Sequence, residues 1–444
     1  MNDCEGIGEQ AQVFSQALES FVRPLLELLD KRLDKRLVRT FLLTLSAILM
    51  FRHNRNGLLL SELGGYILTP QQAPAGTKRL SNLLRSSRWS AWMIGRFLWQ
   101  GASQFIEAQA GLGQRALVLW DESVIEKPES IALEGLCAVR SSRARRLKRI
   151  KPGYYNPPGG PPICVPGMHW MTLLVVGMTG YPRLAAMKWW TTRGKFATQA
   201  RPTAVQLLQR AAYFWQQRVI HVWDRGFAHG PWLGEAFRFD VHFIVRWKTN
   251  QKLVDGLGKR NAWKITRGKR SLDHRLIWDA RRQCWRKTGL YFTPVTHPDY
   301  PDQPLFLVVS RPGQGRSPWY LLTNVSLASL DDAWALVLAY ARRWQIEMTY
   351  RFAKTELAIE SPRLWSWPNR LKLMMMVALV YAFLLSLLAP AFEPLRAYLL
   401  QYWCPRTGRH LRQVAAPLYR IRAALARLWL SHPPPFSFDW TFSG

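Results

Sequence analysis

Four polar side chains recur at helical spacing in the segment YARRWQIEMTYRFAK: Tyr340, Arg343, Glu347 and Lys354. An α-helix rotates by about 100° per residue, so all four would lie within a stripe of about 60° on one predicted helix. One carboxylate among two cations and a phenol suits a metal-assisted phosphate site, because the acid holds a cation while Arg and Lys bind phosphate oxygens. Arg343 and Glu347 are also an i,i+4 pair, so the segment alone is equally consistent with an exposed, salt-bridged helix face.

Two aspartates favour the catalytic interpretation. Asp121 ends the apolar run RALVLWD (115–121), and Asp224 follows the apolar residues of RVIHVWDRG (218–226), as expected for acids at the ends of buried strands. Two divalent ions about 3.5–4 Å apart need several carboxylate oxygens from different elements. The sequence therefore predicts that Asp121, Asp224 and Glu347 together bind two metal ions.

Neighbouring acidic and imidazole groups are weaker candidates. Glu122 and Glu126 compete with Asp121 as ligands, but strand alternation turns Glu122 away from the side that Asp121 faces. His221 and His229 flank Asp224, where a surface or supporting role is favoured over metal ligation.

These residues resemble the DDE transposases of bacterial insertion sequences. The resemblance rests on Asp121 in LVLWDESVIEKP, Asp224 in VIHVWDRGF, and the Tyr-x2-Arg-x3-Glu-x6-Lys spacing that is the hallmark of the insertion-sequence-4 group. It covers roughly residues 115–360 and implies a ribonuclease-H-like fold. It also implies Mg²⁺ (or Mn²⁺) as the metal and the terminal inverted repeats of the element as the substrate.

Basic and aromatic side chains are predicted to contact DNA. The stretch VRSSRARRLKRIK (139–151) has seven lysines and arginines and no acid, and it follows the strand that carries Asp121. In the resembled group a tryptophan of the insertion stacks on a flipped base, which implies this role for Trp319, with core packing as the alternative. The predicted DNA contacts are Tyr340, Arg343, Lys354, Trp319, Arg246, Lys248, Arg143, Arg145, Arg146 and Lys148.

The elements that must position these residues follow an α/β order. Apolar runs predict strands at 115–121, 168–178, 183–190, 218–226 and 242–247, with a helix at about 197–217 before the fourth strand. Three strands, a helix, a strand, a helix and a strand is the order of a ribonuclease-H-like domain, a mixed sheet flanked by helices. Strand-like runs at 290–298, 304–310 and 318–325 predict a β-rich insertion over about 250–328, followed by one long helix from about residue 330.

Three domains are predicted. Residues 1–110 form an all-α domain with a basic run from Lys31 to Arg39, interpreted as DNA-end-binding, with a helical cap on the next domain as the alternative. Residues 111–360 form the ribonuclease-H-like catalytic domain, and residues 361–444 form C-terminal helices and a basic tail.

The charge balance points to a polyanionic partner. The chain has 444 residues, with 61 Lys and Arg against 29 Asp and Glu, a net charge of +32. Nucleic acid is the first candidate for a soluble protein with that field. Five scattered cysteines without a CxxC pair argue against a disulfide framework or a structural zinc site and suit a reducing compartment.

One apolar segment bears on localisation. Leu373 to Ala389 is a run of 17 residues with Ser386 as its one polar side chain, just short of the ~18 residues that indicate a membrane span. A core helix buried on all sides is favoured over a single late span. With an N-terminus that lacks the layout of a signal peptide, this predicts a protein of the bacterial cytoplasm, associated with DNA and not with a membrane.

The sequence thus predicts a cut-and-paste DNA transposase that acts on double-stranded DNA and is at least dimeric when two element ends are bound. Two alternatives remain open at this stage. One is a ribonuclease-H-like nuclease that cuts without joining strands, and the other is a DNA-binding regulator descended from a transposase.

Overall fold

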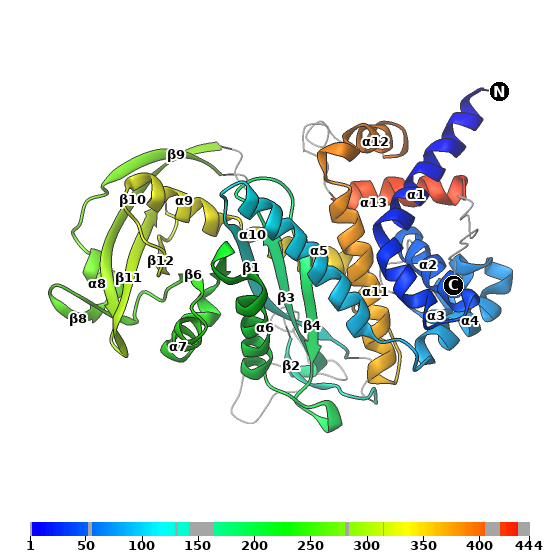
Figure 1. Cartoon of the computed structure of the whole chain (residues 1–444), viewed down its shortest axis with the longest axis horizontal. Coiled ribbons are helices and arrows are strands. Elements are labelled where there is room, and N and C mark those ends of the chain that lie inside the picture. Colours follow the sequence, from blue (N-terminus) through cyan, green and yellow to red (C-terminus); the bar gives the residue numbers. More distant parts are fainter. Residues whose placement is uncertain are drawn as a thin grey trace.

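The computed structural model describes residues 2–51, 56–128, 132–141, 164–279, 284–313, 315–404 and 418–433. Figure 1 shows three neighbouring parts: a group of helices at the end where the N-terminus lies, a mixed sheet in the middle, and a second group of strands at the far end. The chain is therefore a mixed α/β protein with one large sheet and many helices.

Five strands of the central sheet lie in the order β4–β3–β1–β5–β6. β3 pairs antiparallel with both β1 and β4, whereas β5 is parallel to both β1 and β6. These are the five strands that the apolar runs predict. Their bounds are β1 Ala116–Glu126, β3 Cys164–Val176, β4 Arg183–Trp190, β5 Val219–Trp223 and β6 His242–Arg246, and the short β2, Cys137–Arg140, pairs with the start of β3.

Side-chain alternation explains why the sheet is buried on both faces. In β1, Leu117 and Leu119 enter one hydrophobic core, while Val118 and Trp120 enter the other. Helices α5, α6 and α7 supply Trp99, Leu208 and Trp232 to the second core, and α10 and α11 pack in the first. Their bounds are α5 Ala91–Gly111, α6 Ala200–Trp215, α7 Gly230–Arg238, α10 Trp344–Thr355 and α11 Trp367–Ser386.

The predicted β-rich insertion continues the same sheet, because β12 pairs antiparallel with β6. The order then runs β12–β11–β10–β7–β8, and β9 pairs with β10. The bounds are β7 Lys252–Asp255, β8 Gly258–Asn261, α8 Ala262–Thr266, β9 Asp273–Asp279, β10 Cys284–His297, β11 Tyr300–Arg311 and β12 Trp319–Thr323.

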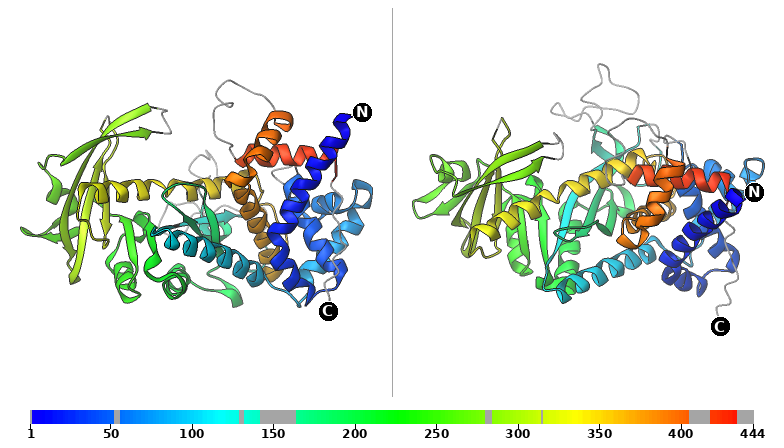
Figure 2. Two further views of the ribbon diagram at one scale, coloured as in Figure 1. Left: turned by 45° about the horizontal axis from the view of Figure 1, so that its top comes forward. Right: turned by 90° about the horizontal axis from the view of Figure 1, so that it is seen from above.

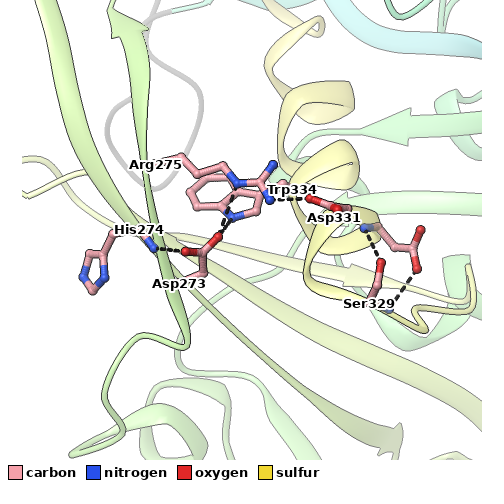
Figure 3. Close-up of polar contacts among 7 residues, drawn as sticks. Asp273, His274, Arg275, Ser329, Asp331 and Trp334 are labelled. Carbon is pink, nitrogen blue, oxygen red and sulfur yellow. Dashed lines mark hydrogen bonds and ion pairs between the residues drawn. The ribbon is translucent and has the colours of Figure 1, made fainter.

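Polar contacts tie this insertion to the next helix, α9, Leu330–Ala341 (Figure 3). Asp273 of β9 accepts a hydrogen bond of 2.8 Å from Trp334 Nε1, and Arg275 forms an ion pair with Asp331. Ser329 and Asp332 form a capping box at the start of α9. The insertion therefore holds the helix that leads towards Arg343.

The remaining helices share the first core from both ends of the chain (Figure 2). Gly64 and Gly76 let α3 and α4 touch, since a Cβ on Gly76 would lie 2.2 Å from the Gly64 carbonyl oxygen. The predicted domain boundaries at 110 and 360 fall beside the end of α5 and between α10 and α11, and they stay predictions. The bounds are α1 Asn2–Asp30, α2 Lys35–Met50, α3 Leu60–Ile67, α4 Ala73–Arg85, α12 Glu393–Tyr398 and α13 Leu418–Ser431.

The apolar segment near residue 380 forms most of α11. Within the described part of the chain, α11 is the one helix long and apolar enough to cross a membrane, and 83% of its most apolar stretch is buried in the protein. Its first turns bury two cations on backbone carbonyls: Arg370 Nη1 donates to Leu364 O at 2.9 Å and Lys372 Nζ to Ser86 O at 2.7 Å.

Candidate active site

The two predicted aspartates lie on neighbouring parallel strands at the same edge of the sheet. The last residues of β1 and β5 that pair with each other are Leu119 and Val222, so Asp121 and Asp224 follow this ladder by two residues each. Both line one cavity of about 430 Å³. Asp224 also accepts a hydrogen bond of 2.7 Å from the Gly226 backbone N–H, which begins a tight turn after β5.

Asp121 does not end its strand, which corrects the sequence prediction. β1 continues to Glu126 because the long β3 still pairs with it, from Glu122↔Met171 to Glu126↔Gly167. Asp121 lies where the pairing with β5 has stopped and the pairing with β3 has not. At Asp121 the strand is therefore paired on one side, with β3, and no longer with β5.

Burial and neighbouring carboxylates perturb the acids of this cavity. Burial raises the pKa of Asp121 to about 7, Arg343 opposes the rise, and Asp224 and Glu347 add to it. Burial also raises the pKa of Glu122, with His169 opposing and Asp224 reinforcing the rise. Glu122 lines the same cavity, so the prediction that alternation separates it from Asp121 does not remove it from the site.

The predicted single helix is two helices, which is a second correction. α9 ends at Ala341, α10 begins at Trp344, and the link is tightened by hydrogen bonds of 3.0 Å from Arg343 N to Tyr340 O and from Ile346 N to Arg343 O. These i→i−3 bonds interrupt the regular helix, so the stripe drawn on one straight helix does not describe all four side chains.

Arg343 connects the carboxylates of two different elements. Its guanidinium forms an ion pair with Glu347 in the first turn of α10, and its Nη1 lies 3.5 Å from Asp121 Oδ2 on β1. Because the side chain reaches both acids, Arg343 is more than an exposed partner of Glu347. The structure thereby brings together Asp121, Arg343 and Glu347, with Asp224 close enough to influence Asp121.

Tyr340 and Trp319 pack against each other. Tyr340 is buried at the end of α9, and its ring meets Trp319 edge-on with centroids 5.2 Å apart. Burial raises the pKa of Tyr340, opposed by the cations of Arg343 and Arg246. Trp319 is half-buried in this contact. Its predicted stacking on a DNA base stays a prediction.

Lys354 points away from open solvent. Its Nζ donates to Val124 O of β1 at 2.6 Å and lies 3.6 Å from Glu360 Oε1. Arg246, at the end of β6, influences Tyr340, and Lys248 follows half-buried. The other predicted DNA contacts, Arg143, Arg145, Arg146 and Lys148, lie outside the described residues.

Sequence reasoning missed two contributors to this region. Arg201 of α6 lines the cavity and forms a 3.2 Å ion pair with Glu235. The feature of the sequence that could have indicated it is a cation at the start of a predicted helix. Tyr350 donates from its hydroxyl to the Asp121 backbone carbonyl. No sequence pattern marks that contact, since the acceptor belongs to the main chain.

The donor set suits a hard divalent cation, because Asp121, Asp224 and Glu122 offer carboxylate oxygens around one cavity. Across the described ranges, however, no group of three or more His, Cys, Asp or Glu side chains is drawn close enough to hold a metal ion. Glu347 is instead bound to Arg343. The three-carboxylate metal site therefore stays a prediction.

Comparison with known proteins finds a family model that is similar to part of the chain. No curated protein matches the sequence. Among solved structures, a piggyBac transposase in a synaptic complex with hairpin DNA is similar at 12% identity and a TM-score of 0.36; the match covers 71% of this chain and 52% of that chain, about half its length. Residues 197–383, which include Asp224, Arg343 and Glu347, match the family model of the transposase DDE domain, and this match supports a DDE transposase.

Proposed function

We propose that this protein is a DNA transposase that cleaves and joins strands at the terminal inverted repeats of an insertion sequence of the insertion-sequence-4 group. The observation that carries the proposal is the arrangement of Asp121, Asp224, Arg343 and Glu347 within and beside a segment that matches the transposase DDE domain. The strand order β4–β3–β1–β5–β6 supports a ribonuclease-H-like catalytic domain.

Asp121, Asp224 and Glu347 would hold two Mg²⁺ or Mn²⁺ ions. Such ions would stabilise the negative charge on the attacking and leaving oxygens during phosphodiester cleavage. Arg343 lies between Asp121 and Glu347, so it would hold the two acids in place and could turn towards a phosphate oxygen when cations neutralise them.

Both chemical steps are displacements at phosphorus. Water first attacks the phosphodiester at the element end, the P–O3′ bond breaks, and a 3′ hydroxyl is released. That hydroxyl then attacks a phosphodiester of the target, and a second 3′ hydroxyl leaves. No covalent bond to the protein is needed, and the role of the side chains is to align the strand end.

The helical end of the molecule supports recognition of the element's ends. Exposed cations lie in the turn before α2 and in its first turns: Lys31, Arg32, Lys35, Arg36 and Arg39. With a net charge of +32, the chain would bind duplex DNA through phosphates and act in the bacterial cytoplasm as a dimer on two ends. Replacing Lys31, Arg32, Lys35, Arg36 and Arg39 by glutamine should then reduce the preference for element ends more than metal-dependent nicking.

The decisive experiment begins with the DNA that flanks the gene. Inverted repeats found there are made as duplexes and incubated with the protein and Mg²⁺, and both cleaved ends and joined products are measured. Cleavage with joining supports a transposase, whereas cleavage that never yields joined strands identifies a nuclease and binding without cleavage identifies a regulator.

A salt series tests the electrostatic part of the proposal. If about six to ten phosphates are contacted, DNA affinity should fall roughly 10³–10⁵-fold between 50 and 200 mM salt. An affinity that does not change with salt would contradict binding through phosphates.

A further inference from the structure

We propose that Lys354 and Tyr350 are positioning residues that fix the spacing between Glu347 and Asp121, rather than contacts to DNA. This inference rests on the proposed function. It assigns a role to two side chains of α10 that point at the same strand, β1, as the one that carries Asp121.

The contacts on β1 come from one face of α10. Tyr350 and Lys354 are four residues apart, so they lie on the same face of the helix, about one turn from each other. Tyr350 donates to the carbonyl of Asp121 itself, and Lys354 Nζ donates to Val124 O at 2.6 Å. Glu347 precedes Tyr350 by three residues on the same helix, so it lies close to this face.

A reciprocal contact strengthens the attachment. Lys127, directly after β1, is buried and donates from Nζ to Pro362 O at 2.7 Å and to the Glu360 carbonyl in the segment after α10. Glu360 also faces Lys354, at 3.6 Å. The helix thus binds the strand, and the strand binds the segment that follows the helix.

Packing prevents Tyr350 from reaching solvent. It is 7% exposed, and its ring meets Trp170 of β3 edge-on at 4.6 Å between centroids. The side chain of Lys354 is 20% exposed, and its ammonium already has two oxygen partners. A lysine held in this way would have to leave Val124 of β1 and Glu360 before it could bind a phosphate.

The spacing matters because the two acids sit on different elements. Asp121 moves with β1 and Glu347 moves with α10. Arg343 bridges the two acids through side-chain contacts alone. The bonds from Tyr350 and Lys354 end on backbone atoms of β1, so they hold the elements themselves. A misplacement of about 1 Å at a reacting site can lower a rate by about 10²-fold.

The test compares Lys354→Met, Lys354→Arg and Tyr350→Phe with Arg351→Met, which removes a cation from the exposed face of the same helix. Single-turnover cleavage of a pre-nicked element end is measured at saturating DNA and Mg²⁺. We expect Lys354→Met to fall by about 10²-fold. Tyr350→Phe should fall less, Lys354→Arg should recover part of the rate, and Arg351→Met should match the wild type.

Two further measurements separate positioning from DNA binding. Mn²⁺ binding without DNA, followed by electron paramagnetic resonance, should weaken in Lys354→Met and not in Arg351→Met. DNA affinity and its salt dependence should be unchanged. A weaker affinity with a salt slope smaller by about 0.9 would assign Lys354 to a phosphate and overturn the proposal.

The outcomes also distinguish this inference from the proposed function. If the wild type cleaves no element end, the proposed function fails, and Mn²⁺ binding still tests the spacing of the acids. If the wild type cleaves and Lys354→Met and Tyr350→Phe both equal Arg351→Met in rate and Mn²⁺ binding, the positioning role is wrong.

Discussion

β1 and β5 lie side by side and each carries one aspartate, but they hold it in different ways. β5 stops at Trp223, and Asp224 begins a tight turn in which its carboxylate accepts from Gly226 N at 2.7 Å. β1 runs on past Asp121 to Glu126 against β3, and the Asp121 carbonyl is bound by Tyr350. One acid is fixed by its own turn, and the other by strands and a helix distant in sequence.

Because of this difference, separate parts of the fold determine the positions of Asp224 and Asp121. Local changes after β5 should disturb Asp224 alone, since its support comes from the next two residues. The position of Asp121 depends on β3 and on α10, the helix that also carries Glu347. Asp121 and Glu347 are therefore coupled through the fold, and Asp224 is comparatively independent.

Removal of the carboxylates should have the largest effect on strand cleavage, and the effect should be similar for the acids on both elements. We expect Asp121→Asn, Asp224→Asn and Glu347→Gln each to lower strand cleavage by roughly 10⁴-fold, because each removes a charge that the proposed cations need. DNA binding should persist, as measured by titration of a labelled element end. Full cleavage by any one variant in Mg²⁺ would remove that residue from the site.

Arg343 should be the next most sensitive position, on the coupled side of the comparison. Arg343→Ala removes charge-assisted contacts of about 1.5–3 kcal/mol, which corresponds to roughly a 10- to 150-fold lower single-turnover rate. Arg343→Lys should rescue only in part, because a point charge cannot reproduce the guanidinium fork. If Arg343→Ala shows no residual cleavage at saturating Mg²⁺ and DNA, Arg343 and Glu347 form one coupled network in which Arg343 positions Glu347.

Gly226 tests the local support of Asp224. A Cβ at this position would lie 2.9 Å from Asp224 Oδ1, so Gly226→Ala should push the carboxylate aside without touching β1. We expect a rate loss of at most about 10²-fold, by misplacement of one acid. Mg²⁺ titration of cleavage, with Gly256→Ala in open space as the matched control, measures it. Equal rates for the two variants would show that the turn does not position Asp224.

The sequence predicts the parts of this fold that depend on side-chain chemistry. Apolar runs predicted the five central strands. Residue types predicted Asp121, Asp224, Arg343 and Glu347 as site residues, and the structure brings Asp121, Arg343 and Glu347 together. Helix α1 lies within the region predicted to be all-α, and its pattern is readable in the sequence, since Phe14, Leu18 and Val22 recur at helical spacing and are buried.

Other features depend on partners that no local pattern reveals. β1 extends past Asp121 because β3 is long enough to pair with it. The break between α9 and α10 occurs without proline or glycine. The contacts of Tyr350 and Lys354 end on backbone carbonyls, which every residue has, so residue types alone could not predict them.

The smallest expected effect concerns a buried side-chain hydrogen bond that joins β1 to β5 directly beneath the aspartates. Trp120 Nε1 donates to His221 Nδ1 at 2.9 Å, one residue before Asp121 and three before Asp224. Burial, with a smaller contribution from His242, lowers the pKa of His221 to about 3. The folded state therefore binds this proton less readily than the unfolded chain, whose histidines titrate near ~6.5. Stability from His221 is complete above about pH 6.5 and is lost as the pH falls towards 3.

Replacement of His221 separates its hydrogen bond from its titration. His221→Gln can keep an acceptor for Trp120 and cannot titrate, so its free energy of unfolding should fall less steeply than that of the wild type between pH 6.5 and 4. His221→Phe leaves a buried indole N–H without its acceptor and should lose about 1–3 kcal/mol at neutral pH. Urea unfolding across the pH series, in buffer containing a chelator, measures both the pH dependence of the free energy of unfolding and its loss at neutral pH. If His221→Gln retains the wild-type slope, another group controls the acid sensitivity. If His221→Phe is as stable as the wild type, β1 and β5 do not need this bond to stay in register, and the coupling between the two aspartates is weaker than their adjacency implies.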